Sequence, residues 1–177
     1  MDDLTERVLL FGPGGNLGPF WVDALHSANK KILGLGSEKN LPVKTRMQLS
    51  AFHEFDLLNP DLELLLKLVQ DFRPTEFVLN SGIDSPPGDG QSSPTSYSYE
   101  SWHNMFQVNC LSLVILMNTL QALDMSGLRI VVIGSMYSQV SPNPKNYSHF
   151  NNGVGFIKHP GYGATKAALR NLVKQYS

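Results

Sequence analysis

Residues 8–18 read VLLFGPGGNLG, an apolar run that passes directly into a turn with glycines at positions 12, 15 and 18. A continuous apolar run of this length is typical of a strand buried on both faces of a parallel sheet. The spacing Gly12-x-x-Gly15-x-x-Gly18 precedes an apolar segment of helical character at 20–25. Residues without Cβ permit a tight turn, and a helix N-terminus offers N–H groups to phosphates. The segment therefore predicts a strand–turn–helix unit able to hold a pyrophosphate.

Further strands are predicted at similar apolar segments: Lys31–Leu35, Leu49–Phe55 (the weakest), Phe77–Leu79 and Arg129–Ile133. Apolar residues at helical spacing predict helices at 62–72, 102–120 and 164–176. Strands that alternate with helices form crossover units. The predicted fold is α/β, a doubly wound parallel sheet of about five strands in a three-layer α/β/α arrangement.

Composition narrows the class of protein. The chain has 177 residues, of which 42% are apolar, and its formal net charge is −1. This length suits a single domain over residues 1–177, and the balanced charge argues against a nucleic-acid partner. Cys110 is the only cysteine, so an internal disulfide is excluded. No secretory signal is apparent, and the longest apolar run, 111–117, is too short to cross a membrane. We expect a cytoplasmic protein without membrane contact, and the histidine spacing predicts no metal site.

The end of the second predicted strand bears on which dinucleotide would bind. An acidic residue about 20 positions after the glycine turn holds a ribose 2′-hydroxyl in NAD-binding folds. Here Gly36 or Ser37 occupies that place, and Glu38 and Lys39 follow. Small residues with Ser37 and Lys39 leave room for a 2′-phosphate, which slightly favours NADP, whereas Glu38 keeps NAD possible.

Tyr162 and Lys166 are four residues apart at the start of the last predicted helix, so they share one face. Tyrosine is a poor acid or base at neutral pH, and a neighbouring cation favours its phenolate form. Upstream, Ser135 follows the strand that ends at Ile133. Asn109 lies inside the long predicted helix, where an amide needs a partner.

These elements, taken in order, resemble the short-chain dehydrogenase/reductase superfamily over nearly the whole chain. The motifs that carry the resemblance are the glycine turn, Asp56-Leu57, Asn80-Ser81-Gly82, Val108-Asn109, Gly134-Ser135 and Tyr162-x-x-x-Lys166. The sequence departs from the family where Asn16 replaces a common glycine and where Ser81 replaces the usual alanine.

The resemblance implies roles for individual residues. Tyr162 would be the general acid/base, Lys166 would favour its phenolate and bind the nicotinamide ribose, and Ser135 would orient the substrate oxygen. Asn109 would hold a water in a proton relay through Lys166. The remaining implied contacts are with NAD or NADP: Gly12, Gly15, Asn16, Leu17 and Gly18 at the pyrophosphate, Ser37 at the ribose, Asp56 and Leu57 at the adenine, and Asn80, Ser81 and Gly82 along the cleft.

Alternative interpretations stay open at this point. Asn109 could bond neighbouring backbone, Asp56 could be a helix N-cap, and Ser135 could be a turn residue. The resemblance implies an NAD(P)(H)-dependent oxidoreductase that transfers a hydride between nicotinamide and a secondary alcohol or ketone. The long interval between Ser135 and Tyr162 resembles the sugar-nucleotide-modifying branch of the superfamily, so an epimerase or dehydratase is the alternative. Whole domains of this superfamily continue beyond the tyrosine helix, so a truncated, non-catalytic dinucleotide-binding protein is a third alternative. The resemblance also implies a homo-oligomer acting on a small-molecule substrate.

Overall fold

The computed structural model describes residues 6–84, 96–149 and 157–177, which form two compact units. The first unit comprises Met1–Ser81 and Ser112–Ile133, and the second comprises Gly82–Leu111 and Gly134–Ser177. Each unit is described by itself below. The predicted single domain over residues 1–177 stays a prediction.

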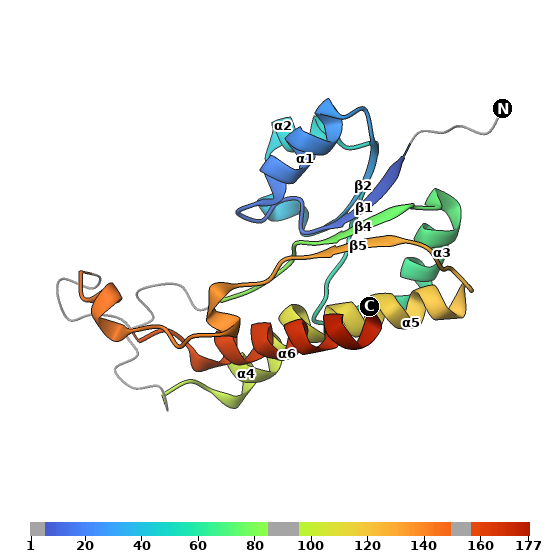
Figure 1. Ribbon diagram of the computed structural model, residues 1–177. Helices are drawn as coiled ribbons and strands as arrows, with labels where there is room; N and C mark the ends of the chain where they lie inside the picture. The colour runs from blue at the N-terminus through green and yellow to red at the C-terminus, as the bar shows by residue number, and fades with distance from the viewer. Residues whose placement is uncertain (1–5, 85–95, 150–156) are drawn as a thin grey trace. The chain divides into compact units, whose positions relative to one another are not determined.

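The first unit contains a five-stranded, all-parallel sheet in the order β3-β2-β1-β4-β5 (Figure 1). The strands are β1 (Arg7–Phe11), β2 (Lys31–Gly36), β3 (Ala51–Glu54), β4 (Glu76–Leu79) and β5 (Arg129–Val132). All five predicted strands are confirmed, although the predicted third strand, 49–55, extends too far at both ends. Phe11 pairs with Leu35 on one side and with Leu79 on the other. The register therefore brings the carboxyl ends of β1, β2 and β4 to the same edge of the sheet.

Helices cover both faces of this sheet (Figure 1). α1 (Gly18–Ser27) and α2 (Val43–Gln48) lie on one side, and α3 (Leu62–Phe72) and α5 (Ser112–Ala122) lie on the other. The three-layer arrangement predicted from the sequence is thus confirmed. The sequence did not predict α2 or the 3-10 turn η1 (Glu38–Asn40), because six and three residues are too few to show helical periodicity.

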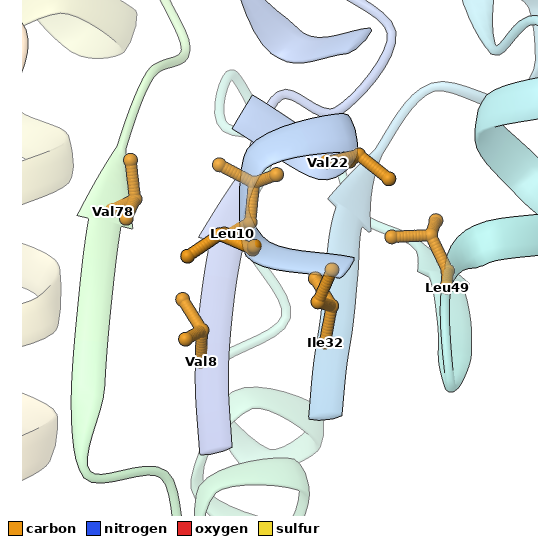
Figure 2. Packing of buried hydrophobic residues seen from close by; sticks show 7 residues of the cluster. Val8, Leu10, Val22, Ile32, Leu49 and Val78 are labelled. Atoms are coloured by element: carbon orange, nitrogen blue, oxygen red, sulfur yellow. The ribbon is translucent and has the colours of Figure 1, made fainter. Parts of the chain in front are cut away.

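The apolar core on the α1 side of the sheet is built from alternate strand residues. Val8 and Leu10 of β1, Ile32 of β2 and Val78 of β4 belong to one buried cluster with Val22 of α1 (Figure 2). All of these side chains are at most 2% exposed. β1 and β4 are buried along their length except at Arg7, whereas β5 is only half-buried after the exposed Arg129. The apolar run at residues 8–11 therefore belongs to a central strand, as its composition predicted.

A buried carboxylate lies at the amino edge of the sheet. The Glu76 side chain is 11% exposed, and its two oxygens accept bonds from Lys30 Nζ at 2.8 and 2.9 Å. Arg129 forms a second ion pair with Glu76, and Lys30 also pairs with Glu6 at 3.0 Å. The bonds with the two glutamates raise the pKa of Lys30. These ion pairs connect β4 with β5 and with the turn before β2.

The second unit contains α4 (Tyr99–Phe106), the π-helical turn η2 (Gln107–Leu111) and α6 (Pro160–Tyr176), together with the 3-10 turns η3 (Met136–Ser138) and η4 (Pro144–Tyr147). The helix predicted at 102–120 is therefore interrupted by a π-turn, which side-chain periodicity does not reveal. α6 begins four residues before the predicted 164, because Pro160 suits the first helical turn and His159 caps it. As a result, Tyr162 lies in the first turn of α6.

One helical stretch in the described residues, Tyr99–Ala122, is long and apolar enough by length and composition to cross a membrane, with a mean hydropathy of 1.3. Half of its most apolar window is buried inside the protein. Core helices of soluble domains have the same properties, so this finding is weak evidence for a membrane span.

Candidate functional site

The glycine turn that follows β1 is closed by contacts within the first unit. Gly12 has a φ of +78°, and a Cβ at this position would lie 2.8 Å from Ser81 Oγ. Asn80 follows β4 and donates from Nδ2 to the Gly12 carbonyl at 2.7 Å. A Cβ on Gly18 would collide with the carbonyls of Pro13 and Gly12. The turn therefore requires glycine at positions 12 and 18 for its own packing, and the structure places Asn80 and Ser81 next to it.

Gly15 differs from these two glycines. A Cβ there would lie 3.5 Å from the Gly12 carbonyl oxygen and 3.7 Å from Asn80 Nδ2, which are ordinary contact distances, so packing does not require a glycine. Gly15, Asn16 and Leu17 are exposed, and α1 begins next to them without an acidic residue in its first turn or a side-chain cap. The positive end of the helix dipole is thus uncompensated by side chains. A bare backbone beside such a helix end fits a pyrophosphate group, because phosphate oxygens can approach the N–H groups closely.

Three other residues predicted to contact the dinucleotide follow the carboxyl ends of β2 and β3. Ser37 is exposed at the N-terminus of η1. Asp56 is exposed and its Oδ1 accepts from Leu58 N at 2.9 Å; Asp61, rather than Asp56, caps α3. Leu57 is buried, so its side chain packs inside the protein and only its backbone is suited to adenine contact.

Gly14 is a residue that the sequence analysis did not select. A Cβ on Gly14 would lie 2.6 Å from the carbonyl oxygen of Asn40 and 3.1 Å from the nitrogen of Leu41. The end of η1 therefore packs directly against the glycine turn. The sequence shows Gly14 only as an additional glycine in the turn. Its partner, Asn40, lies 26 residues away, so residue spacing does not identify it.

Asn109 lies in the π-turn η2 and is 1% exposed. Its Oδ1 accepts from Ile83 N at 2.7 Å, and its Nδ2 donates to Ile83 O at 2.8 Å and to Thr165 Oγ1 at 3.2 Å. Both amide hydrogens are therefore used within the second unit. Of the two interpretations of Asn109, the structure shows the one in which the amide bonds neighbouring backbone, and it places Asn109 beside α6.

Lys166 lies in the second turn of α6 and is 4% exposed. Its Nζ is 5.9 Å from the centre of the Tyr162 ring, and a Cβ on Gly82 would lie 3.6 Å from that Nζ and 3.5 Å from Asn109 Oδ1. The structure thus brings together Gly82, Asn109, Tyr162 and Lys166. Burial lowers the pKa of Lys166, because removing an ammonium from water disfavours its charged form. Negatively charged or strongly polar ligand groups near this ammonium would offset that loss of hydration.

Ser135 precedes η3, and its Oγ accepts from Tyr137 N at 3.2 Å, which is the turn role left open by the sequence. η3 approaches α6 closely, since a Cβ on Gly163 would lie 2.9 Å from the Tyr137 carbonyl oxygen. The rings of Tyr137 and Tyr162 meet edge to face at 6.5 Å. Gly163 therefore allows the Ser135 turn to lie against the first turn of the helix that carries Tyr162.

The hydroxyl of Tyr137 is bonded to that of Tyr147 in η4. Burial, together with this bond, raises the pKa of Tyr147 to about 12. Tyr147 therefore remains a neutral phenol at neutral pH. The bond connects η4 to the turn that follows Ser135.

The segment before α6 is held at three consecutive residues. The Tyr97 hydroxyl bonds to the Ile157 carbonyl, Lys158 forms an ion pair with Asp84, and His159 Nε2 lies 2.9 Å from Ser101 Oγ. His159 is fully buried, and its Nδ1 accepts from Gly161 N at 2.9 Å. Burial lowers the pKa of His159, and the charge of Asp84 acts in the opposite direction. These contacts fix the start of the helix that positions Tyr162.

The protein was compared with known sequences and structures. No protein-family model matches the sequence, and no curated protein matches it. Among solved structures, a short-chain dehydrogenase family protein from Francisella tularensis is similar, with a TM-score of 0.69 and 19% identity over 97% of this chain and 62% of that one. A short-chain dehydrogenase from Sphingobium yanoikuyae, in complex with NADPH, has a TM-score of 0.70 and 20% identity over 96% and 64% of the two chains. A 4-hydroxyisoleucine dehydrogenase complexed with NADH has a TM-score of 0.69 and 18% identity over 97% of this chain and 68% of that one.

The chain therefore has the fold of these short-chain dehydrogenases, which confirms the predicted fold. It spans 62% of the length of the Francisella protein. At identities of 18–20%, these similarities establish the fold alone.

Proposed function

We propose that this chain is an NAD(P)(H)-dependent oxidoreductase that interconverts a secondary alcohol and a ketone, with Tyr162 as the general acid/base. The observation that supports this most strongly is the grouping of Tyr162, Lys166, Asn109 and Gly82 in one compact unit of a dehydrogenase fold. The four residues come from three distant segments of the chain. A helix face that was merely solvated would not have its lysine 4% exposed and next to a fully bonded asparagine.

Each residue has a specific task in this proposal. The dinucleotide would supply or accept the hydride at its nicotinamide ring. The Tyr162 hydroxyl would take the proton from the substrate hydroxyl during oxidation and return it during reduction. Ser135 would donate a hydrogen bond to the substrate oxygen, and Lys166 would bind ribose hydroxyls while its charge favours the phenolate.

Asn109 supports this site differently from the initial expectation. Because its amide hydrogens are occupied by Ile83 and Thr165, we assign its side chain the task of holding Gly82–Ile83 against α6. A π-turn also displaces one backbone carbonyl from the regular helical ladder. A relay water would therefore bind the backbone of η2 rather than the Asn109 amide.

For the cofactor, we propose a preference for NADP over NAD. Ser37 and Lys39 are both exposed after β2, and Gly36 stands where an acidic residue would hold a 2′-hydroxyl. The adjacent Glu38 is the one acidic group of that turn. Parallel titrations with NADPH and NADH, followed by nicotinamide fluorescence, test the preference, and equal or tighter binding of NADH would contradict it.

Tyr162→Phe tests the proposed mechanism. Turnover of secondary alcohols or ketones should fall about a hundredfold or more, the contribution typical of a general acid/base. The dissociation constant for NADPH should change little, since only a hydroxyl is removed. The matched control is Tyr176→Phe, the same change at an exposed position near the end of α6, which should leave turnover unchanged.

The outcomes separate the proposal from its rivals. Turnover in Tyr162→Phe close to that of the wild type would refute the mechanism. Tight NADPH binding by the wild type with no turnover over a broad panel of alcohols and ketones would favour a non-catalytic dinucleotide-binding protein. Cofactor that stays bound during purification, with activity toward a nucleotide sugar, would favour the epimerase or dehydratase alternative.

A further inference from the structure

Lys158 lies over the ring of Tyr162, although it is not part of the tyrosine–lysine motif. Its Nζ is 4.8 Å from the centre of the Tyr162 ring and 5.5 Å from that of Tyr137. The corresponding distance from Lys166 to the Tyr162 ring is 5.9 Å. Ammonium groups attract an aromatic ring within about 6 Å of its centre. Of the two lysines that the described residues place within 6 Å of the centre of the Tyr162 ring, Lys158 is therefore the nearer.

We propose that Lys158 is a positioning residue for Tyr162: its ammonium orients the phenol ring and favours the phenolate, and Asp84 limits this effect by its opposite charge. The inference rests on the proposed function of Tyr162. The proposal adds Lys158 to the site as a second cation beside Lys166. It also gives a role to Asp84, which is not part of the Tyr162-x-x-x-Lys166 motif.

The backbone of Lys158 is held rigidly enough for such a role. The preceding residue, Ile157, accepts a bond from the Tyr97 hydroxyl, and the following residue, His159, is fully buried. The His159 ring lies 4.0 Å from the ring of Tyr97 and 4.9 Å from that of Trp102. The Lys158 side chain is only 13% exposed. Water therefore screens its charge less than that of a surface lysine.

The charges around Tyr162 predict the direction of the effect. In the described residues, the ionisable groups that face its ring are Lys158, Lys166 and Tyr137, whose hydroxyl is bonded to that of Tyr147. Asp84 acts through Lys158, with which it forms an ion pair, and is 28% exposed in its side chain. The Asp84 carboxylate partly offsets the charge of Lys158. A cation over the ring is attracted more strongly when the phenol carries negative charge.

Two substitutions that break the same ion pair should therefore have opposite effects. Lys158→Met removes the cation but keeps a side chain of similar length, so ionisation of Tyr162 should require a higher pH. Asp84→Asn keeps the cation and removes its counter-charge, so ionisation should require a lower pH. If the ion pair only held the two segments together, both substitutions would disturb the site in the same direction.

The experiment measures tyrosinate absorbance against pH in the full chain, with and without Tyr162→Phe in each background. The difference between the two curves isolates Tyr162. Lys158→Met should shift the midpoint and the acidic limb of kcat/KM to higher pH, with turnover at neutral pH reduced about threefold to tenfold. Lys158→Arg should restore the wild-type values, and Asp84→Asn should shift both to lower pH. Lys174→Met, at an exposed position of α6, is the control that should shift neither.

Shifts in the same direction for Lys158→Met and Asp84→Asn, or no shift in either, would overturn the inference. If Lys158→Met fails to fold, as judged by circular dichroism, Asp84→Asn and Lys158→Arg still decide the matter. The absorbance titration does not depend on turnover. Retained activity in Tyr162→Phe would refute the proposed function alone, whereas an unmoved Tyr162 curve in an otherwise active enzyme would refute only the role of Lys158.

Discussion

Substitution of His159 tests how the first turn of α6 is held. His159 Nδ1 accepts from Gly161 N at 2.9 Å, and because this nitrogen is the acceptor, Nε2 carries the hydrogen and donates to Ser101 Oγ. His159→Phe keeps a ring between Tyr97 and Trp102 but removes both polar atoms. The loss of a cap and an unpaired buried N–H together cost about 2 kcal/mol of unfolding free energy. His159→Ala also removes the buried ring, and we expect a loss of about 3–5 kcal/mol.

The pH dependence of stability gives a second signature. Burial lowers the pKa of His159 below the ordinary value of 6.5, so the folded protein holds this histidine neutral. As pH falls below 6.5, His159 becomes protonated in the unfolded chain while it is still neutral in the folded protein. The contribution of neutral His159 to the free energy of unfolding is therefore complete above pH 6.5 and is lost as pH falls through the folded-state pKa. About one pH unit below 6.5 the loss amounts to at most about 1.4 kcal/mol.

Urea unfolding followed by circular dichroism provides the assay. At neutral pH, His159→Phe should lower the midpoint by about 1 M urea, given a slope of about 2 kcal/mol per M. Between about pH 7.5 and about pH 5.5, the wild type should lose more stability than this variant, which lacks the titrating group. A His159→Phe protein as stable as the wild type at neutral pH, or one with the same loss on acidification, would refute the assignment of His159 as a buried neutral cap.

Three further predictions concern the glycines and the buried carboxylate. Gly15→Ala should fold normally, because the new Cβ would lie no closer than 3.5 Å to its neighbours, but it should weaken NADPH binding about tenfold or more. Gly12→Ala, at a φ of +78°, should instead lower the free energy of unfolding by about 1–3 kcal/mol. The reverse pattern in NADPH titration and thermal unfolding would contradict the pyrophosphate site. Gly163→Ala should force η3 away from α6, since its Cβ would lie 2.9 Å from a carbonyl oxygen, and should reduce kcat with little change in NADPH affinity; wild-type kcat would show that this approach is unimportant. Glu76→Gln should lower unfolding free energy by about 2 kcal/mol in urea titrations, mainly through Lys30, because Arg129 is 65% exposed; an unchanged midpoint would mean that the network adds nothing to stability.

The sheet was predictable because its strands carry local signals. Central strands of a parallel sheet are buried on both faces, so Val8–Phe11 and Phe77–Leu79 are continuous apolar runs between turns. The edge strands β3 and β5 are half-exposed, and the boundaries predicted for β3 were accordingly wrong by one to two residues. The short α2 and the π-turn at 107–111 escaped prediction, since neither leaves a periodic pattern of apolar residues.

The candidate site divides in the same way. Glycine spacing and the Tyr162–Lys166 pair are visible in the sequence because one turn of backbone imposes each pattern. The partners of Asn109, which are Ile83 and Thr165, lie 26 and 56 residues away and carry no motif of their own. The same holds for the packing of Asn40 on Gly14 and for the position of Lys158 over Tyr162.

By itself, the sequence determined the class of fold, the glycine turn and the helix face shared by Tyr162 and Lys166, since each of these depends on neighbours within a few residues. Only the tertiary structure decided which polar groups meet: the Asn109 amide and the Ile83 backbone, the His159 ring and the Ser101 hydroxyl, and the Lys158–Asp84 ion pair. The physical reason is that a buried polar group is stabilised by whichever partner folding places within hydrogen-bonding or ionic distance. That partner can lie anywhere in the chain, so local spacing does not identify it.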